Sequence, residues 1–186
     1  CSQLMKTAAI IPVRMASTRL PGKVLTLINS KPVLGHLIDR LKACNTLDEI
    51  IVATSQNEEN NAIEDYCQVS DVTCFRGSEE NVLERLVFAL KDSAADIGVL
   101  AFGDGPLVDP ALVDSFVRKF VKNGSIDFLS NDLKTTYPPG MEVEVFKTTA
   151  LLDSHARNDN FATREHGTLY IRQHPEHYKC ENIEAP

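Results

Sequence analysis

Short apolar runs alternate with segments of helical periodicity along most of the chain, and this alternation constrains the fold more than any other feature. The apolar runs occupy residues 8–13, 49–54, 72–75 and 96–102. The first intervening segment places leucine or isoleucine at residues 34, 37, 38 and 41, which share one face of a helix. Strands that alternate with helices normally form a parallel sheet with helices on both faces. The sequence therefore predicts a layered α/β fold with a mainly parallel sheet.

The remaining pattern continues in the same way. Helices are expected over residues 58–68, 78–90, 109–120, 148–157 and 164–174, and two more strands over 126–129 and 141–146. Ser78 is expected to cap the helix that follows it, because a serine side chain satisfies a free amide of the first turn. Asp109 and Pro110 are expected to begin another helix. No repeat or linker interrupts the pattern, so residues 1–186 are predicted to form a single domain.

Charge and composition exclude several classes of protein. The 26 acidic and 19 basic side chains give a net charge of −7, whereas nucleic-acid-binding surfaces carry an excess of lysine and arginine. No apolar run approaches the roughly 18 to 20 residues of a membrane helix, and no secretory leader is recognised. The five cysteines are widely spaced, so we expect reduced thiols. The sequence predicts a cytoplasmic protein that binds neither nucleic acid nor membranes.

The loop after the first predicted strand concentrates positive charge in this acidic chain. It contains Arg14, Arg19 and Lys23, together with Ser17 and a Pro-Gly turn. In open α/β sheets, ligands bind beyond the carboxyl ends of the strands, where this loop lies. Guanidinium, ammonium and hydroxyl groups suit the oxygens of a nucleoside triphosphate. The loop matches neither the P-loop nor the G-x-G-x-x-G pattern, which disfavours a P-loop ATPase and a nicotinamide-dependent dehydrogenase.

Asp104 follows the fourth predicted strand, in the turn Gly103-Asp104-Gly105-Pro106. A carboxylate at this edge of the sheet can hold Mg²⁺ against phosphates that bind to the first loop. The same residues also suit a turn without any metal. Glu142 and Glu144 share one face of a predicted strand and are candidates for a second metal-binding carboxylate.

The pattern Arg14-x-x-Ser17-x-Arg19-x-Pro21-x-Lys23 resembles the signature of the cytidylyltransferases that activate acidic sugars. Stretches at residues 75–83, 103–110, 137–146 and 164–172 extend the resemblance over nearly the whole chain. It is strongest to the spore coat polysaccharide biosynthesis protein F group, relatives of the synthetases of CMP-keto-deoxy-octulosonate and CMP-neuraminate. The resemblance implies a three-layer Rossmann-like nucleotidyltransferase fold. It also implies a reaction in which a sugar oxygen attacks the α-phosphorus of CTP and expels pyrophosphate.

The resemblance further implies roles for individual residues and partners. Arg14, Lys23 and Asp104 would be catalytic, with Mg²⁺ bound to Asp104. The nucleotide would contact Arg14, Ser17, Arg19, Lys23, Arg76 and Ser78, and the acceptor sugar would contact Arg164, Glu165 and His166. Relatives suggest a homodimer. They also carry a Val-Asp-x-Pro-Glu-Asp segment with a metal-binding carboxylate, which we expect just beyond Pro186.

The sequence therefore favours transfer of CMP to an acidic or modified sugar, for surface polysaccharide or glycan biosynthesis. A glycosyltransferase that consumes a nucleotide sugar is one alternative, but it would need an Asp-x-Asp motif where this chain has only Asp104. A nucleotide-binding homologue without catalytic activity is a second alternative. Release of pyrophosphate would distinguish the leading hypothesis from this last one.

Overall fold

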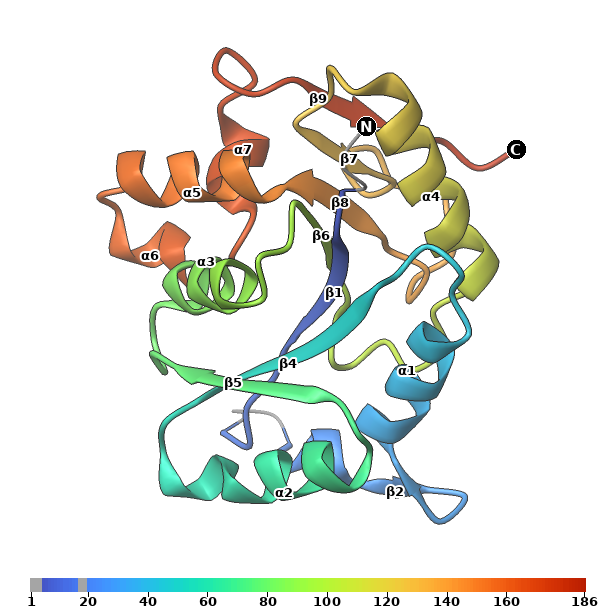
Figure 1. Cartoon of the computed structure of the whole chain (residues 1–186), viewed down its shortest axis with the longest axis vertical. Coiled ribbons are helices and arrows are strands. Elements are labelled where there is room, and N and C mark those ends of the chain that lie inside the picture. The colour runs from blue at the N-terminus through green and yellow to red at the C-terminus, as the bar shows by residue number, and fades with distance from the viewer. Residues whose placement is uncertain (1–4, 17–19) are drawn as a thin grey trace.

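The computed structural model of the chain describes residues 5–16 and 20–186 and shows a central sheet with helices on both sides (Figure 1). Its strand order is β5-β4-β1-β6-β8-β7-β9. The strands of this sheet are β1 (Thr7–Pro12), β4 (Glu49–Ser55), β5 (Thr73–Gly77), β6 (Ile97–Leu100), β7 (Phe128–Ser130), β8 (Glu144–Lys147) and β9 (Cys180–Asn182). The helices are α1 (Val33–Lys42), α2 (Asn61–Val69), α3 (Val82–Asp92), α4 (Pro110–Asn123), α5 (Thr148–Arg157), α6 (Phe161–Arg164) and α7 (Leu169–Gln173). Smaller elements are the paired strands β2 (Leu27–Ile28) and β3 (Lys31–Pro32) and the 3-10 helices η1 (Lys23–Leu25) and η2 (Glu58–Asn60).

Four neighbouring strands of the sheet, β5, β4, β1 and β6, run parallel. Strand β8 is antiparallel to β6 and β7, and β9 is parallel to β7. The predicted mainly parallel sheet is confirmed. Ile10 of β1 lies opposite Ile51 on one side and Leu100 on the other, so the three central strands reach their carboxyl ends together. The loops after β1 and β6 therefore lie at the same edge of the sheet.

The two faces of the sheet are covered by different helices. Ala9 and Ile11 of β1 belong to a core formed with α1, α2 and α4, whereas Ala8 and Ile10 belong to a core formed with α3, α5 and α7 (Figure 1). This division arises because successive side chains of a strand point to opposite faces. Strand β1 is apolar after Thr7 because both of its faces are buried. The three predicted layers are confirmed.

Some predicted boundaries are wrong, and each error has a local cause. The helix expected over residues 164–174 is only α7, because α6 ends at Arg164 and a turn in which Gly167 has a φ of +53° separates the two helices. Ser78 is not the cap of α3: the N-cap is Asn81, whose side chain accepts a hydrogen bond from the Glu84 amide at 3.0 Å. Asp109 does cap α4, as predicted. None of the helices in the described ranges is long and apolar enough to cross a membrane.

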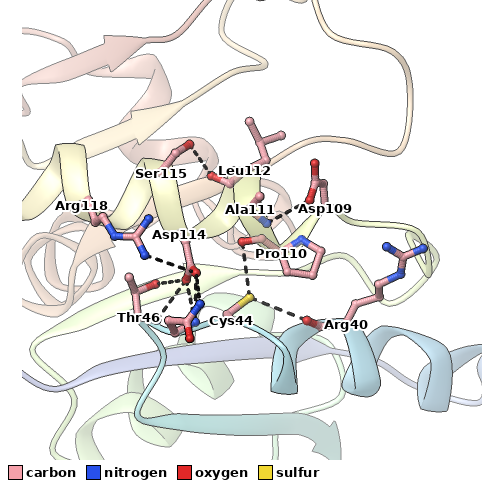
Figure 2. Close-up of polar contacts among 11 residues, drawn as sticks. Arg40, Cys44, Thr46, Asp109, Pro110, Ala111, Leu112, Asp114, Ser115 and Arg118 are labelled. Carbon is pink, nitrogen blue, oxygen red and sulfur yellow. Dashed lines mark hydrogen bonds and ion pairs between the residues drawn. The ribbon is translucent and has the colours of Figure 1, made fainter.

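A buried carboxylate on α4 fastens the loop between α1 and β4 (Figure 2). Asp114 accepts hydrogen bonds from the amides of Asn45 and Thr46, each at 3.0 Å, and from the Thr46 hydroxyl at 2.7 Å. Arg118, one helical turn away, lies 3.6 Å from the same carboxylate. Burial acts to raise the pKa of Asp114, but the hydrogen bonds from Asn45 and Thr46 outweigh it and lower the pKa. The ionised Asp114 therefore ties α4 to the end of α1.

Replacing Asp114 with alanine is expected to lower the free energy of unfolding by about 2 kcal/mol, because two backbone amides lose their acceptor. Since the pKa of Asp114 in the folded protein lies below its unfolded value, this contribution is present at neutral pH and declines as the pH falls from about 4 toward the lowered pKa of the folded state. Urea denaturation at pH 7 and pH 3 measures both effects. Asp109→Ala, which removes a single cap hydrogen bond, should cost about 1 kcal/mol at pH 7. Equal losses in the two variants would contradict the role of Asp114.

Candidate active site

A cavity of about 660 Å³ opens where the parallel strands reach their carboxyl ends. Its walls come from the ends of β1 and β6, from the first turns of α3, and from residues 165–172, which include most of α7. The volume falls within the range of small-molecule binding sites. Among the predicted site residues, Arg14, Glu165 and His166 line this cavity. The structure therefore brings one residue expected to bind the nucleotide together with two expected to bind the acceptor.

Two cations of the first loop form ion pairs in the free protein. Arg14 Nη1 lies 3.0 Å from a carboxylate oxygen of Glu79, and Lys23 Nζ lies 3.3 Å from a carboxylate oxygen of Asp104. Lys23 follows the turn at Gly22, whose φ of +71° is readily adopted by glycine. The cations of both ion pairs are exposed, although Glu79 is only partly so, and a polyanionic ligand can therefore replace the carboxylates at little cost. The fold thus places Lys23 and Asp104 side by side, as the sequence analysis expects of groups that act on the same ligand.

Two predicted nucleotide contacts cannot be placed in this arrangement, because Ser17 and Arg19 lie outside the described residues. Their proposed roles stay predictions. The described residues on either side of them are joined by a hydrogen bond, in which the Gly22 amide donates to the carbonyl of Met15 at 2.9 Å.

The carboxylates at this edge fit a metal ion only in part. Asp104 is the candidate ligand, and its side chain is 64% exposed. In the described part of the chain, no three histidine, cysteine or acidic side chains gather closely enough to hold a metal. Mg²⁺ favours one or two protein carboxylates together with phosphate oxygens and water. Asp104 therefore suits an ion that arrives with a triphosphate, rather than one held by the protein alone.

Glu142 and Glu144 do not share one face of a strand, contrary to the prediction from their spacing. Only Glu144 belongs to β8, and Glu142 precedes the strand, where it accepts a hydrogen bond from the Gly140 amide. Glu144 is buried, and its oxygens accept hydrogen bonds from Thr168 at 2.6 Å and Arg172 at 2.8 Å. Since both oxygens already have partners, Glu144 is committed to contacts within the protein.

These contacts belong to a buried ion cluster on the cavity wall that sequence analysis missed. Arg172 on α7 pairs through Nη1 with Glu144 at 2.8 Å and with Asp132 at 2.9 Å. Burial raises the pKa of Glu144 to about 7, while the hydrogen bond from Thr168 and the charge of Arg172 act in the opposite direction. With two carboxylates on one guanidinium, Arg172 has no free positive charge to offer a ligand. The cluster joins three parts of the chain, namely β8, α7 and the segment that follows β7. It thereby holds together the part of the cavity wall that these residues form.

Arg76 does not line the cavity. It lies near the end of β5, where Nε donates to the Ser55 carbonyl at 3.0 Å and Nη2 donates to the Asn57 carbonyl at 2.9 Å. Nη1 forms an ion pair with Glu64 at 2.6 Å and a hydrogen bond with Asn61. All three guanidinium nitrogens therefore have acceptors within the protein. These contacts give Arg76 a structural role between β4, β5 and α2, and its contact with the nucleotide stays a prediction.

Ser78 and Arg164 are likewise used within the protein. The Ser78 hydroxyl accepts a hydrogen bond from the Asn81 amide at 3.1 Å, which shapes the turn before α3. Arg164 donates to the carbonyls of Asn158 and His155 at 2.6 and 3.2 Å and so joins α5 to α6. Neither residue lines the cavity, in contrast to the neighbouring Glu165 and His166.

A mixed sheet of this order, with a cationic loop after β1 and a carboxylate after β6, defines a nucleotidyltransferase-like α/β domain. The chain belongs to the cytidylyltransferase family, because the model of the family described as Cytidylyltransferase matches residues 8–185. Membership places it among CTP-dependent nucleotidyltransferases and confirms the resemblance on which the site was predicted.

Individual relatives agree with this assignment. The chain is 36% identical over 185 residues to the spore coat polysaccharide biosynthesis protein SpsF of Bacillus subtilis, covering 95% of this chain and 74% of the relative. A cytidylyltransferase structure from Leptospira borgpetersenii matches with a TM-score of 0.93 and 31% identity, covering 97% of this chain and 76% of that one. The structure of CMP:2-keto-3-deoxy-manno-octonic acid synthetase complexed with CTP matches with a TM-score of 0.75 and 19% identity, covering 97% of this chain and 90% of that one. This last match supports the fold.

Proposed function

We propose that this chain transfers CMP from CTP to an acidic or otherwise modified sugar and releases pyrophosphate. The observation that carries the proposal is the placement of Lys23 beside Asp104, at the sheet edge where Arg14 lines a cavity. One edge of the sheet thus combines cations suited to phosphate with a carboxylate suited to a metal. The same edge has room for a second substrate. Membership of the cytidylyltransferase family supports CTP as the nucleotide.

The proposed reaction needs positioning and charge neutralisation more than a nucleophilic side chain. The acceptor hydroxyl releases its proton to solvent as its oxygen bonds to the α-phosphorus and the bond to pyrophosphate breaks. Arg14 and Lys23 leave their carboxylate partners, hydrogen-bond the phosphate oxygens and stabilise the negative charge that gathers on the leaving group. Glu165 and His166 line the part of the cavity proposed for the acceptor. Mg²⁺, bound through Asp104 and phosphate oxygens, would supply further neutralisation.

The biological setting forms a separate part of the proposal. The chain is proposed to act as one domain in a cytoplasmic homodimer, on a sugar destined for a surface polysaccharide or glycan. The name of the Bacillus subtilis relative supports such a pathway. Size-exclusion chromatography with light scattering tests the dimer.

Two measurements test the function. First, thermal unfolding is followed with ATP, CTP, GTP or UTP, each with and without Mg²⁺. CTP with Mg²⁺ should stabilise most, and a ligand at about 100 times its dissociation constant adds roughly 2.7 kcal/mol. Second, pyrophosphate release from CTP is assayed with a panel that includes N-acetylneuraminate and keto-deoxy-octulosonate. Stabilisation by CTP without release on any sugar would point to a nucleotide-binding homologue, and no stabilisation by CTP would overturn the proposal.

Asp104→Asn is expected to abolish the Mg²⁺-dependent part of the CTP-induced thermal shift. The amide keeps the shape of the turn but removes the negative charge that attracts the ion. Without Mg²⁺, CTP should bind the variant at least as well as the wild type, because Lys23 is released from its ion pair. Thermal unfolding with and without CTP and Mg²⁺ measures these changes. A full Mg²⁺ response in the variant would show that Asp104 does not bind the ion.

A further inference from the structure

The cavity contains a buried arginine that the mechanism above does not use. Arg85 lies one turn into α3, is 2% exposed, and ranks among the largest fully buried side chains. Its Nη1 donates to the carbonyls of Ser78 and Glu79, at 2.7 and 3.4 Å. Its Nε is buried and has no hydrogen-bond partner among the described residues. The guanidinium therefore has donor capacity left over at the cavity wall.

The charge of Arg85 is also left without an ion pair. Within the described ranges no carboxylate lies within 4.0 Å of it, and the nearby Glu79 pairs with Arg14 instead. Burial lowers the pKa of Arg85 to about 10, so the side chain stays protonated near neutral pH. Burying a cation and an unsatisfied donor costs free energy unless a partner is supplied. Arg172, in the same cavity, shows the usual solution with its two carboxylates.

The surroundings of Arg85 indicate the kind of partner. Val13, Val82, Leu86 and Leu100 line the cavity together with Arg85 and Arg14, so the cavity offers apolar surface as well as the guanidinium of Arg85. A phosphate would lose its hydration against such side chains, and the exposed cations Arg14 and Lys23 suit it better. A nucleobase matches both features, because its flat faces are apolar while its edge carries hydrogen-bonding groups. Arg85 can only donate hydrogen bonds to that edge, because a guanidinium has no acceptor.

We propose that Arg85 hydrogen-bonds the O2 and N3 edge of cytosine and thereby makes the site prefer CTP to UTP. This inference rests on the proposed function. The O2 and N3 atoms of cytosine are both acceptors, so Nε–H and Nη2–H of one guanidinium fork can bind them together. Uracil keeps O2 but carries a hydrogen on N3, and that hydrogen would face an arginine donor. One donor of Arg85 would then stay unsatisfied in a buried position, which discriminates against UTP.

The test measures dissociation constants of CTP and UTP by calorimetry, in the presence of Mg²⁺, for the whole chain and its variants. The wild type should prefer CTP by at least about tenfold, the effect of one unmade hydrogen bond to a charged group. Arg85→Met keeps a linear side chain but has no donors, so the preference should fall to about threefold or less. Arg85→Gln offers one donor and one acceptor, which suits uracil, so the ratio should move furthest toward UTP. Arg118→Met, an exposed arginine on the opposite side of the sheet, should leave the ratio unchanged.

The outcomes separate this inference from the proposed function. Equal loss of CTP and UTP affinity in Arg85→Met, with the preference retained, would show that Arg85 only supports the turn at Ser78 and Glu79 and would overturn the inference alone. A wild type that binds CTP and UTP equally would contradict both. Melting temperatures without ligand verify that each variant is folded. If Arg85→Met is unfolded, Arg85→Lys takes its place, because it keeps the charge but loses the guanidinium fork. The preference for CTP over UTP should still become smaller in Arg85→Lys. An unchanged ratio of the two dissociation constants would contradict the inference.

Discussion

Arg172→Met is expected to lower the free energy of unfolding by about 3 kcal/mol at pH 8, because it leaves a buried carboxylate without its charged partner. Glu144 is 1% exposed and lies 2.8 Å from Arg172 Nη1. Burial already raises the pKa of Glu144 to about 7 with the guanidinium present, and its removal should raise that pKa further. A carboxyl group whose pKa is raised in the folded state contributes stability at low pH and loses it as the pH rises. The deficit of the variant should therefore grow between pH 6 and pH 8.

Two further variants distinguish a loss of stability caused by the unpaired Glu144 carboxylate from one caused by general damage to α7. Adding Glu144→Gln to Arg172→Met should recover most of the loss at pH 8, because a neutral amide needs no counter-charge. Arg157→Met removes an exposed arginine that pairs with Asp153 on α5, and it should leave the urea midpoint nearly unchanged. Urea denaturation of all four proteins at both pH values gives the comparison. A deficit that is the same at pH 6 and pH 8 would contradict the titration of Glu144.

The layered fold could be predicted because its central strands are buried on both faces. An apolar run such as residues 8–13 has few interpretations other than a buried strand once it alternates with segments of helical periodicity. Helix α5 was predicted with its observed bounds, Thr148–Arg157. Prediction failed where the elements are short. Strand β9 has three residues and is recognisable only through its pairing with β7, while the break between α6 and α7 depends on a turn at Gly167.

The positions of the candidate site residues were predictable where they depend on the order of strands and loops, and not where they depend on tertiary contacts. The cationic loop and Asp104 follow strands that end at one edge, so sequence order alone brings Lys23 and Asp104 together. Arg85 sits inside an apolar helical stripe and Glu144 inside an apolar strand, and such interruptions were the only sequence signals of their burial. The partner Arg172 lies 28 residues from Glu144, and no local pattern connects them.

The double variant Arg14→Ala/Lys23→Ala is expected to bind CTP at least about a hundredfold more weakly than the wild type. Each charged side chain contributes roughly tenfold when it hydrogen-bonds a phosphate oxygen. In the free protein both side chains form exposed ion pairs, at 3.0 and 3.3 Å, and such pairs contribute little to stability. The variant should therefore unfold at nearly the wild-type temperature without ligand. Calorimetry with CTP and Mg²⁺, and thermal unfolding without either, measure the two effects.

A matched control tests whether the effect depends on position or on net charge. Lys31→Ala also removes an exposed lysine from an ion pair, with Asp39, but Lys31 lies in β3, outside the loop that holds Arg14 and Lys23, and it does not pair with Asp104. Its CTP affinity should stay within about twofold of the wild type at 0.15 M salt, where exposed charges beyond about 8 Å are largely screened. If Lys31→Ala weakened CTP binding as much as Lys23→Ala alone, general attraction would explain the affinity. If the double variant lost as much stability without ligand as it lost in binding, the loop cations would be structural, and phosphate would have to bind elsewhere.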